Sequence, residues 1–184
     1  MLGSMTLWRT RGSATVYENP WIRVREDAVN RPDGSPGIYG VVEVRKPAVF
    51  VVPVTAEDEV VLVQVDRYTT GRSLEVPAGG SDGEDPLLAA RRELREETGL
   101  VADDWERIGF MYALNGISHA PEHVYLARGL RESAEPAAQA EEGITAVRTV
   151  PWSEVVTLIA NGTITDGETV AALMYAAIAL GRIS

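Results

Sequence analysis

The chain contains no cysteine among its 184 residues, which excludes disulfide bonds and thiolate metal sites. It has no apolar run near the ~20 residues that a membrane-spanning helix requires. No basic segment followed by an apolar one stands near the N-terminus, so a secretory signal is not evident. From these absences we expect a protein of the cytoplasm.

An excess of basic residues is also lacking, because 17 Lys and Arg stand against 27 Asp and Glu, a net charge of -10 at pH 7. A broad nucleic-acid-binding surface would normally be basic, so no nucleic-acid partner is expected. A small anionic substrate is still compatible, since metal ions and a few arginines can neutralise the field locally. The shares of hydrophobic residues (45%) and charged residues (24%) are close to those of globular proteins, and we expect a folded chain of single-domain size.

What the chain does have is a concentration of glutamates in one predicted helix that follows the glycine-rich turn 77–83. Glu93, Glu96 and Glu97 share one side of this helix, because side chains three and four apart are neighbours. Like charges at these spacings destabilise a helix, and a hard divalent cation held by carboxylate oxygens would offset the repulsion. The pattern therefore predicts a magnesium site, and the alternative is an ordinary solvated acidic face.

The neighbours of these glutamates favour the metal site. Arg92 stands four residues before Glu96 and can hold its carboxylate, whereas Glu93 and Glu97 have no basic residue four positions away. The acidic side adjoins the apolar stripe of the helix, formed by Leu87, Ala90 and Leu94. We therefore expect the carboxylates at the edge of the core, where a cleft would lie.

Periodicity predicts strands and helices in alternation along the rest of the chain. The strands are expected at residues 14–17, 22–27, 38–44, 48–54, 60–65, 74–76, 105–112, 123–127 and 146–150. The glutamate-rich helix is expected to end at Gly99, a second helix to run from Pro151 to about Ala160, and a third to begin at Asp166 or Thr169 and end at Gly181. Residues 131–143 are expected to form a flexible loop. This order of elements indicates an α/β layered domain with a mixed sheet.

The glutamate-rich segment resembles the box of the Nudix hydrolase family, whose pattern is G-x5-E-x7-R-E-U-x-E-E-x-G-U with U a bulky aliphatic residue. The matching residues are Glu84, Arg92, Glu93, Leu94, Glu96, Glu97, Gly99 and Leu100. The turn before the box departs from the pattern, because Ala78 occupies the glycine position and Gly79 gives a spacing one residue shorter. The resemblance implies a Nudix-type α/β/α sandwich.

The same resemblance implies roles for the box residues in hydrolysing a pyrophosphate bond with Mg²⁺, or with Mn²⁺ as a substitute. Glu93 and Glu97 would be metal ligands, with Glu96 as a further ligand or support and the carbonyl of Ala78 as an additional one. Arg92 would orient a carboxylate. Glu84 is expected to steady the junction between the turn and the helix.

The general base would lie in a loop before the C-terminal helices, by the same resemblance. Glu141 and Glu142 stand in the corresponding loop of this chain. The alternative is that the segment around them is simply solvated, and the sequence leaves both interpretations open.

The segments around residues 17–22 and 65–68 resemble the ADP-ribose or nucleotide-sugar pyrophosphatase branch of the family. In that branch the N-terminal strands usually form a dimer interface and are sometimes exchanged between subunits. We therefore expect a homodimer, with residues 1–45 as an N-terminal antiparallel strand region at the interface and 46–184 as the Nudix domain. Arg67 would contact a phosphate, and Trp21 would either stack on a base or pack in the dimer.

The substrate is less narrowly defined than the reaction. The ADP-ribose branch tends to carry a proline shortly after the box, and residues 113–118 contain none. The expected substrate is therefore a nucleoside diphosphate linked to another group, such as ADP-ribose or a nucleotide sugar. Two alternatives remain, a nucleoside triphosphate pyrophosphohydrolase and a Nudix-like binding module without catalysis.

Overall fold

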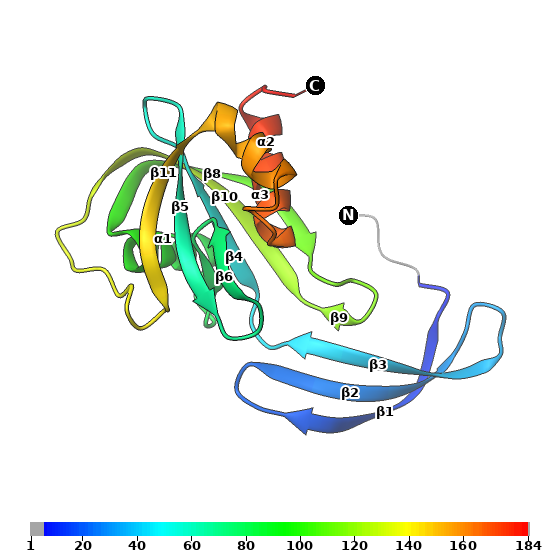
Figure 1. Ribbon diagram of the computed structural model, residues 1–184. Helices are drawn as coiled ribbons and strands as arrows, with labels where there is room; N and C mark the ends of the chain where they lie inside the picture. Colours follow the sequence, from blue (N-terminus) through cyan, green and yellow to red (C-terminus); the bar gives the residue numbers. More distant parts are fainter. Residues whose placement is uncertain (1–5, 184) are drawn as a thin grey trace. The chain divides into compact units, whose positions relative to one another are not determined.

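The computed structural model describes residues 6–183 of the chain. The described residues form two compact units (Figure 1). The first consists of the chain up to Lys46 together with Tyr112–Pro121, and the second of Pro47–Met111 and the residues from Glu122 onwards. By its contacts, the segment 112–121 thus lies in the N-terminal unit.

The first unit is an antiparallel sheet of three long strands with a short fourth at its edge. The strands are β1 (Arg9–Glu18), β2 (Ile22–Asn30), β3 (Pro36–Val44) and β9 (Ser118–His119), in the order β1-β2-β3-β9. β9 pairs with β3 in parallel and was not predicted, because two residues carry no periodic signal. The turn between β2 and β3 is closed by Asp33, whose carboxylate accepts the N–H of Ser35 at 2.9 Å.

The second unit contains a mixed four-stranded sheet in the order β7-β4-β10-β8. Its strands are β4 (Ala48–Pro53), β7 (Ala78–Gly80), β8 (Leu100–Tyr112) and β10 (Pro121–Glu132). β4 runs parallel to β10 and antiparallel to β7. The predicted strand at 48–54 is present as β4, and its apolar run is central and buried because both faces of the strand are covered.

A three-stranded antiparallel sheet completes the strands of this unit. It consists of β5 (Glu59–Arg67), β6 (Gly71–Glu75) and β11 (Ile144–Pro151), with β5 in the middle. The helices α2 (Trp152–Ala160) and α3 (Gly167–Ala179) follow. Leu62 of this sheet, Leu126 of the mixed sheet and Leu173 of α3 are buried in one apolar cluster, so the two sheets and α3 share a core.

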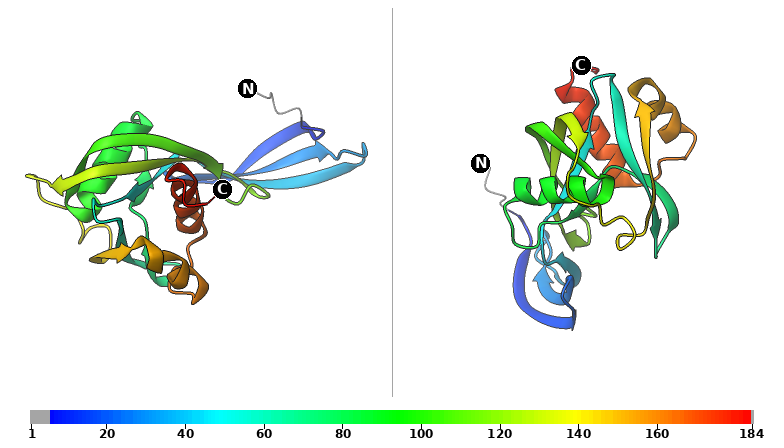
Figure 2. Two further views of the ribbon diagram at one scale, coloured as in Figure 1. Left: turned by 90° about the horizontal axis from the view of Figure 1, so that it is seen from above. Right: turned by 90° about the vertical axis from the view of Figure 1, so that its left-hand side faces the viewer.

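The helix α1 (Pro86–Thr98) covers the other face of the mixed sheet. Val49 and Val51 of β4 pack in a cluster with Ala90 and Leu94 of α1, whereas Phe50 and Val52 join the cluster with α3. Figure 2 shows α1 and α3 on opposite sides of this sheet. The α/β class with a mixed sheet, predicted from the sequence, is confirmed.

Capping residues fix the two ends of α1. The side chain of Asp85 accepts the N–H of Leu87 at 2.9 Å, and Pro86 occupies the first helical position, where its missing N–H costs nothing. Gly99 ends the helix at φ +73, a conformation that favours glycine, and donates its N–H to Arg95 at 2.8 Å. The predicted end at Gly99 is therefore confirmed. No helix among residues 6–183 has the length and apolar character needed to cross a bilayer.

Candidate active site

Two of the three helix glutamates predicted to share a side are buried rather than merely at the edge of the core. Glu93 is 6% exposed and Glu97 is 5% exposed, and both lie on the face of α1 directed to the sheet. The strand β7 makes room for them, because a Cβ on Gly79 would lie 2.3 Å from the carboxylate carbon of Glu93. The short turn before the box therefore places the backbone of Gly79, which has no side chain, directly against the carboxylate of Glu93.

Glu97 has one backbone partner in this site. Its Oε2 accepts the N–H of Ala78 at 2.9 Å. Burial is the main cause that raises the pKa of the Glu97 carboxyl to about 8, and the negative charges of Glu93 and Glu142 raise it as well. The hydrogen bond from Ala78 and the positive charge of Arg67 act in the opposite direction. A buried carboxyl with this pKa lacks sufficient positive charge nearby to stay ionised at low cost.

Glu93 is held by Arg92. The Nη1 of Arg92 lies 2.8 Å from Glu93 and 3.1 Å from Glu96, and its Nη2 donates to the carbonyl of Gly80 at 2.9 Å. The Nε of Arg92 is also 3.4 Å from Glu84. Burial raises the pKa of Glu93 even though the charge and hydrogen bond of Arg92 lower it. Arg92 therefore ties the helix to the β7 turn, and its predicted pairing with Glu96 is present.

The environment of Glu96 differs from that of Glu93 and Glu97. Its side chain is about a quarter exposed and is bracketed by two arginines, with Arg95 at 2.8 Å and Arg92 at 3.1 Å. Among the three glutamates of the helix it is the one that pairs with two arginines. Its position therefore suits support of the site better than it suits direct ligation.

The loop 133–143 is fastened to the C-terminal end of α1. The N–H of Ala138 donates to the carbonyl of Glu96 at 2.8 Å, and the side chain of Gln139 donates to the carbonyl of Glu97 at 3.1 Å. At the other end of the loop, Gly143 accepts the N–H of Asp66 at 3.0 Å. These contacts bring Glu142 close enough to raise the pKa of both Glu93 and Glu97. Glu141 donates its N–H to Ala138 at 3.0 Å.

Arg67 extends from the end of β5 toward the same carboxylates. It forms an ion pair with Glu75 of β6 at 2.5 Å, and the hydrogen bond to Glu75 raises its pKa against the opposing effect of burial. Glu97 and Asp166 raise the pKa of Arg67 further. Glu75 was not predicted as an orienting partner, although an acid between Leu74 and Val76 in an apolar strand was a visible signal.

A second buried acid, Glu122 of β10, was also missed. Glu122 is 5% exposed, and its Oε2 has no hydrogen-bond partner within residues 6–183. Burial, together with the charges of Glu168 and Asp166 at the start of α3, raises its pKa to about 7. The only sequence signal was an acid on the strand face that continues with Val124 and Leu126, both of which are buried.

Ala78 and Trp21 complete the set of residues singled out from the sequence. Ala78 pairs with Phe50 across β7 and β4, so the predicted glycine-rich turn contains a short strand. Trp21 belongs to the N-terminal unit and is 72% exposed. The backbone N–H of Trp21 donates to the side chain of Asn19 at 2.9 Å, so this hydrogen bond leaves the indole ring available for contacts.

The donor set of the second unit fits a hard cation in its chemistry. Glu93 and Glu97 are buried carboxylates whose ionised forms repel each other, and oxygen ligands of this kind suit Mg²⁺. In the described part of the chain, however, no three Asp, Glu or His side chains are already gathered at coordinating distance. The coordination shell of a cation bound here would therefore need further oxygen ligands, such as backbone carbonyls, waters or substrate phosphates.

Comparison with known proteins agrees with this geometry. Residues 44–173 match the NUDIX domain, and residues 8–42 match the nucleoside diphosphate sugar hydrolase N-terminal domain. An ADP-ribose pyrophosphatase of Mycobacterium tuberculosis is 35% identical over 170 residues, 91% of this chain and 82% of that protein. A GDP-mannose pyrophosphatase of Yersinia enterocolitica is 31% identical over 115 residues, 62% of this chain and 60% of that protein. The crystal structure of an ADP compounds hydrolase superposes with a TM-score of 0.83 at 20% identity, covering 98% of this chain and 99% of that chain.

Proposed function

The chain belongs to the NUDIX family and is a hydrolase of the pyrophosphate bond in nucleoside diphosphate derivatives, and we propose that it acts on ADP-ribose or a nucleotide sugar with Mg²⁺. The observation that carries this proposal is the pair of buried carboxylates, Glu93 and Glu97, behind the glycine of β7. The relatives named ADP-ribose pyrophosphatase and GDP-mannose pyrophosphatase support the substrate class.

Glu93 and Glu97 are the proposed ligands of the cation, with Glu96 and the carbonyl of Ala78 as supporting groups. Members of the family generally use divalent metal ions, and Mn²⁺ is the proposed substitute for Mg²⁺. The cation would supply positive charge that orients a water and stabilises the phosphoryl oxygens. Arg92 holds Glu93 in place throughout. The positive charge of the cation would also offset the free-energy cost of burying the ionised Glu97 carboxylate.

Glu142 is the proposed general base. It lies near Glu93 and Glu97, and the loop that carries it is anchored on both sides, so its carboxylate can accept a proton from the attacking water. Glu141 stands beside it and is the alternative. The electrostatic effect of Glu142 on both box carboxylates favours Glu142.

Arg67 is the proposed contact to a substrate phosphate. Its side chain is 44% exposed, so the guanidinium keeps donors free after pairing with Glu75. Glu75 fixes the direction of the side chain through charge-assisted hydrogen bonds. Trp21 is proposed either to stack on the base of the nucleotide or to pack in a dimer.

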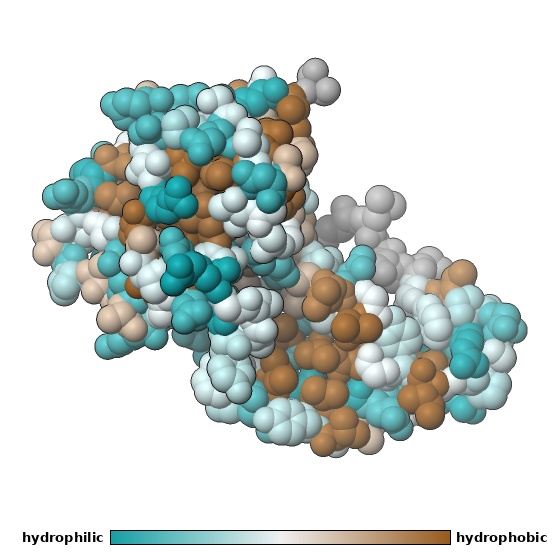
Figure 3. Space-filling model, in the orientation of Figure 1, coloured by the Kyte–Doolittle hydropathy of each residue, from teal (hydrophilic) through white to brown (hydrophobic). Residues whose placement is uncertain are grey.

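A homodimer through the N-terminal unit is part of the proposal. Every residue of β1 is exposed, and Figure 3 shows apolar side chains gathered over the N-terminal sheet. The exposed large hydrophobic residues of this unit are Leu7, Trp8, Val16, Tyr17, Trp21, Ile38, Tyr112, Leu114 and Ile117. Exposed apolar surface of this extent is typical of an interface. We place the enzyme in the cytoplasm, without a nucleic-acid partner.

A substrate panel tests the proposal. Wild type and Glu97→Gln are assayed with Mg²⁺ on ADP-ribose, nucleotide sugars, dinucleoside polyphosphates and nucleoside triphosphates. We expect turnover of ADP-ribose or a nucleotide sugar, with release of a nucleoside monophosphate, and its loss in the variant. Turnover confined to nucleoside triphosphates would support the alternative substrate class. No turnover by a folded, Mg²⁺-binding wild type would support a binding module.

A further inference from the structure

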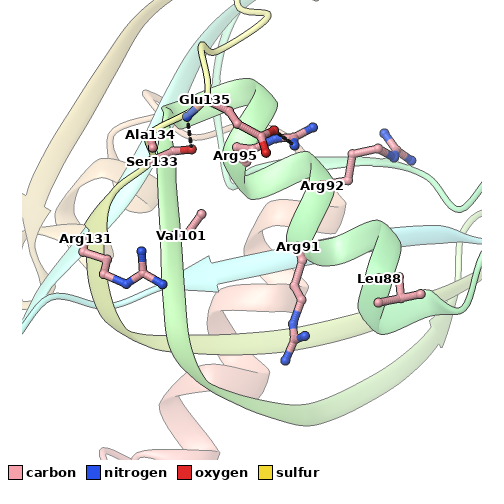
Figure 4. Close-up of a pocket in the computed structure, with 9 residues that line it drawn as sticks. All are labelled: Leu88, Arg91, Arg92, Arg95, Val101, Arg131, Ser133, Ala134 and Glu135. Carbon is pink, nitrogen blue, oxygen red and sulfur yellow. Dashed lines mark hydrogen bonds and ion pairs between the residues drawn. The ribbon is translucent and has the colours of Figure 1, made fainter.

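A hollow lined by arginines lies beside α1, on the side of the helix opposite to the buried Glu93 and Glu97. It has a volume of about 400 Å³ and is formed by α1, β8, the end of β10 and the start of the loop 133–143. Figure 4 shows Arg91 descending from the helix and Arg131 reaching from β10 toward the space over Val101. Its lining residues are Leu88, Arg91, Arg92, Arg95, Val101, Arg131, Ser133, Ala134 and Glu135.

The charge of this hollow is opposite to that of the molecule. Four arginines and one glutamate line it, which leaves an excess of three positive charges where the whole chain carries -10. A cationic concavity on an acidic protein concentrates anions locally, because the walls exclude water and focus the field. The hollow therefore favours an anionic ligand.

Arg92 and Arg95 already have strong partners. Arg92 is paired with Glu93 and Glu96, and Arg95 is paired with Glu96 and with Glu135 at the start of the loop. The charges of these two arginines are therefore largely neutralised by neighbouring carboxylates. Their hydrogen-bonding capacity is largely used, so they are not the residues that would grip a ligand.

Arg91 and Arg131 are much less committed. Arg91 lies 5.9 Å from the ring centre of Trp105, and within residues 6–183 no carboxylate pairs with it. Arg131 pairs with Asp103 at 3.2 Å, but both side chains are more than 60% exposed. An exposed pair of this kind contributes at most about 1 kcal/mol and is readily exchanged for a better acceptor.

We propose that this hollow is a binding site for a phosphate group, held between Arg91 and Arg131. Guanidinium groups bind phosphate oxygens through two parallel hydrogen bonds, which an exposed aspartate pair does not match. Ser133 adds a hydroxyl at the rim, and its oxygen already accepts the N–H of Glu135 at 3.0 Å, so its proton remains available to a ligand. Leu88 and Val101 offer an apolar wall for the organic part of a phosphate monoester.

Calorimetric titration without divalent cation, at constant ionic strength, tests this site. The three probes are inorganic phosphate, adenosine 5′-monophosphate and ribose 5-phosphate, which separate free phosphate from the two kinds of monoester. We expect saturable binding of at least one probe, weakened about tenfold or more in Arg91→Gln/Arg131→Gln, since each arginine supplies a charge-assisted bidentate contact. The matched control Arg128→Gln/Arg148→Gln removes the same charge outside the hollow and is expected to bind like the wild type.

A second pair of variants keeps the test informative if the double variant folds poorly. Asp103→Asn frees Arg131 and is expected to tighten binding, whereas Asp104→Asn, which frees Arg128 instead, is not. Glu97→Gln is expected to bind the probes normally, so failure of this site and failure of the proposed hydrolase activity give different results. Equal weakening in both double variants would show a diffuse charge effect and overturn the site. Absence of saturable binding by all three probes would overturn it as well.

Discussion

Three buried acids of the second unit have a raised pKa, the pair Glu93 and Glu97 and the separate Glu122, and the pair differs from Glu122 in its neighbours. Glu93 and Glu97 are surrounded by an arginine, a backbone N–H and a glycine that makes room for the carboxylate. Glu122 faces Asp166 and Glu168, and one of its oxygens has no partner within residues 6–183. Both groups have a raised pKa, so burial alone does not distinguish a candidate metal site from an isolated acid. What distinguishes Glu93 and Glu97 is the presence of neighbouring groups, an arginine and a backbone N–H, that stabilise the ionised carboxylates.

The largest effect is expected from Glu97→Gln. The substitution preserves size and removes the ligand charge, and we expect kcat to fall by about a thousandfold or more, because the cation would lose a principal anchor. The measurement is the Mg²⁺-dependent hydrolysis rate. Glu122→Gln in the same assay sharpens the comparison, since its turnover is expected within a few-fold of wild type. Equal loss in both variants would erase the distinction between the two groups.

The next largest effect is expected from Glu142→Gln. A general base contributes about a hundredfold or more to a hydrolysis rate, and the matched control Glu141→Gln keeps the charge change while leaving Glu142 in place. We expect kcat to fall in Glu142→Gln and to change little in Glu141→Gln. The reverse order would assign the base to Glu141.

Gly79→Ala tests the glycine that makes room for Glu93. Its Cβ would overlap the carboxylate of Glu93, whereas a Cβ on Gly80 would meet only Asp82, at 3.7 Å. We expect Gly79→Ala to lose about tenfold in activity and about 1–3 kcal/mol in the free energy of unfolding, because overpacking displaces the carboxylate. Gly80→Ala is expected to stay near wild type in both. Activity and denaturation measurements on both variants decide this, and unaffected Gly79→Ala would remove β7 from the site.

The smallest effect concerns stability and pH. A carboxyl whose pKa is raised in the folded state makes the protein less stable as the pH rises from the unfolded pKa to the folded one. For Glu122 this window runs from pH 4.5 to about pH 7, and for Glu97 from pH 4.5 to about pH 8. Replacing Glu122 by Gln is therefore expected to stabilise the protein at pH 8 by about 1–2 kcal/mol, after allowance for solvent screening, and to have no effect below pH 4.5.

Thermal unfolding with and without Mg²⁺ measures these stability changes and also shows whether the cation binds at Glu97 or at Glu122. At pH 8 without divalent cation, Glu97→Gln is also expected to be more stable than wild type. Addition of Mg²⁺ is expected to raise the melting temperature of wild type and of Glu122→Gln but not that of Glu97→Gln. A Mg²⁺ effect that depended on Glu122 instead would place the cation at the other group.

The sequence predicted the long elements because each has its own local signal. The helix α1 ends at Gly99 and α2 spans Trp152–Ala160, as expected from glycine and helix-start signals, and the alternating or apolar strands were recovered. β7 and β9 were not predicted, since strands of two or three residues exist only through their pairing with β4 and β3.

The candidate site was predicted in its helix and only partly in its surroundings. The spacing of Glu93, Glu96 and Glu97 is a property of one helix and can be derived locally. Their different burial cannot, because it depends on which residues face β7 and the loop. Glu75 of β6 pairs with Arg67, and Glu122 of β10 interacts with Asp166 and Glu168 of the α3 start, and contacts of such sequence separation leave no mark on local periodicity. For both residues the one local signal was an acidic residue in an otherwise apolar strand.

Arg92 has a consequence for how this protein acquires activity. Its guanidinium joins groups from the β7 turn, the residues before α1 and the helix itself, through Gly80, Glu84, Glu93 and Glu96. The helix can form early from local contacts, but Arg92 finds all four partners only after β7 has paired with β4. During refolding, recovery of hydrolysis should therefore lag behind recovery of helical structure, so a partly folded chain would not consume nucleotide.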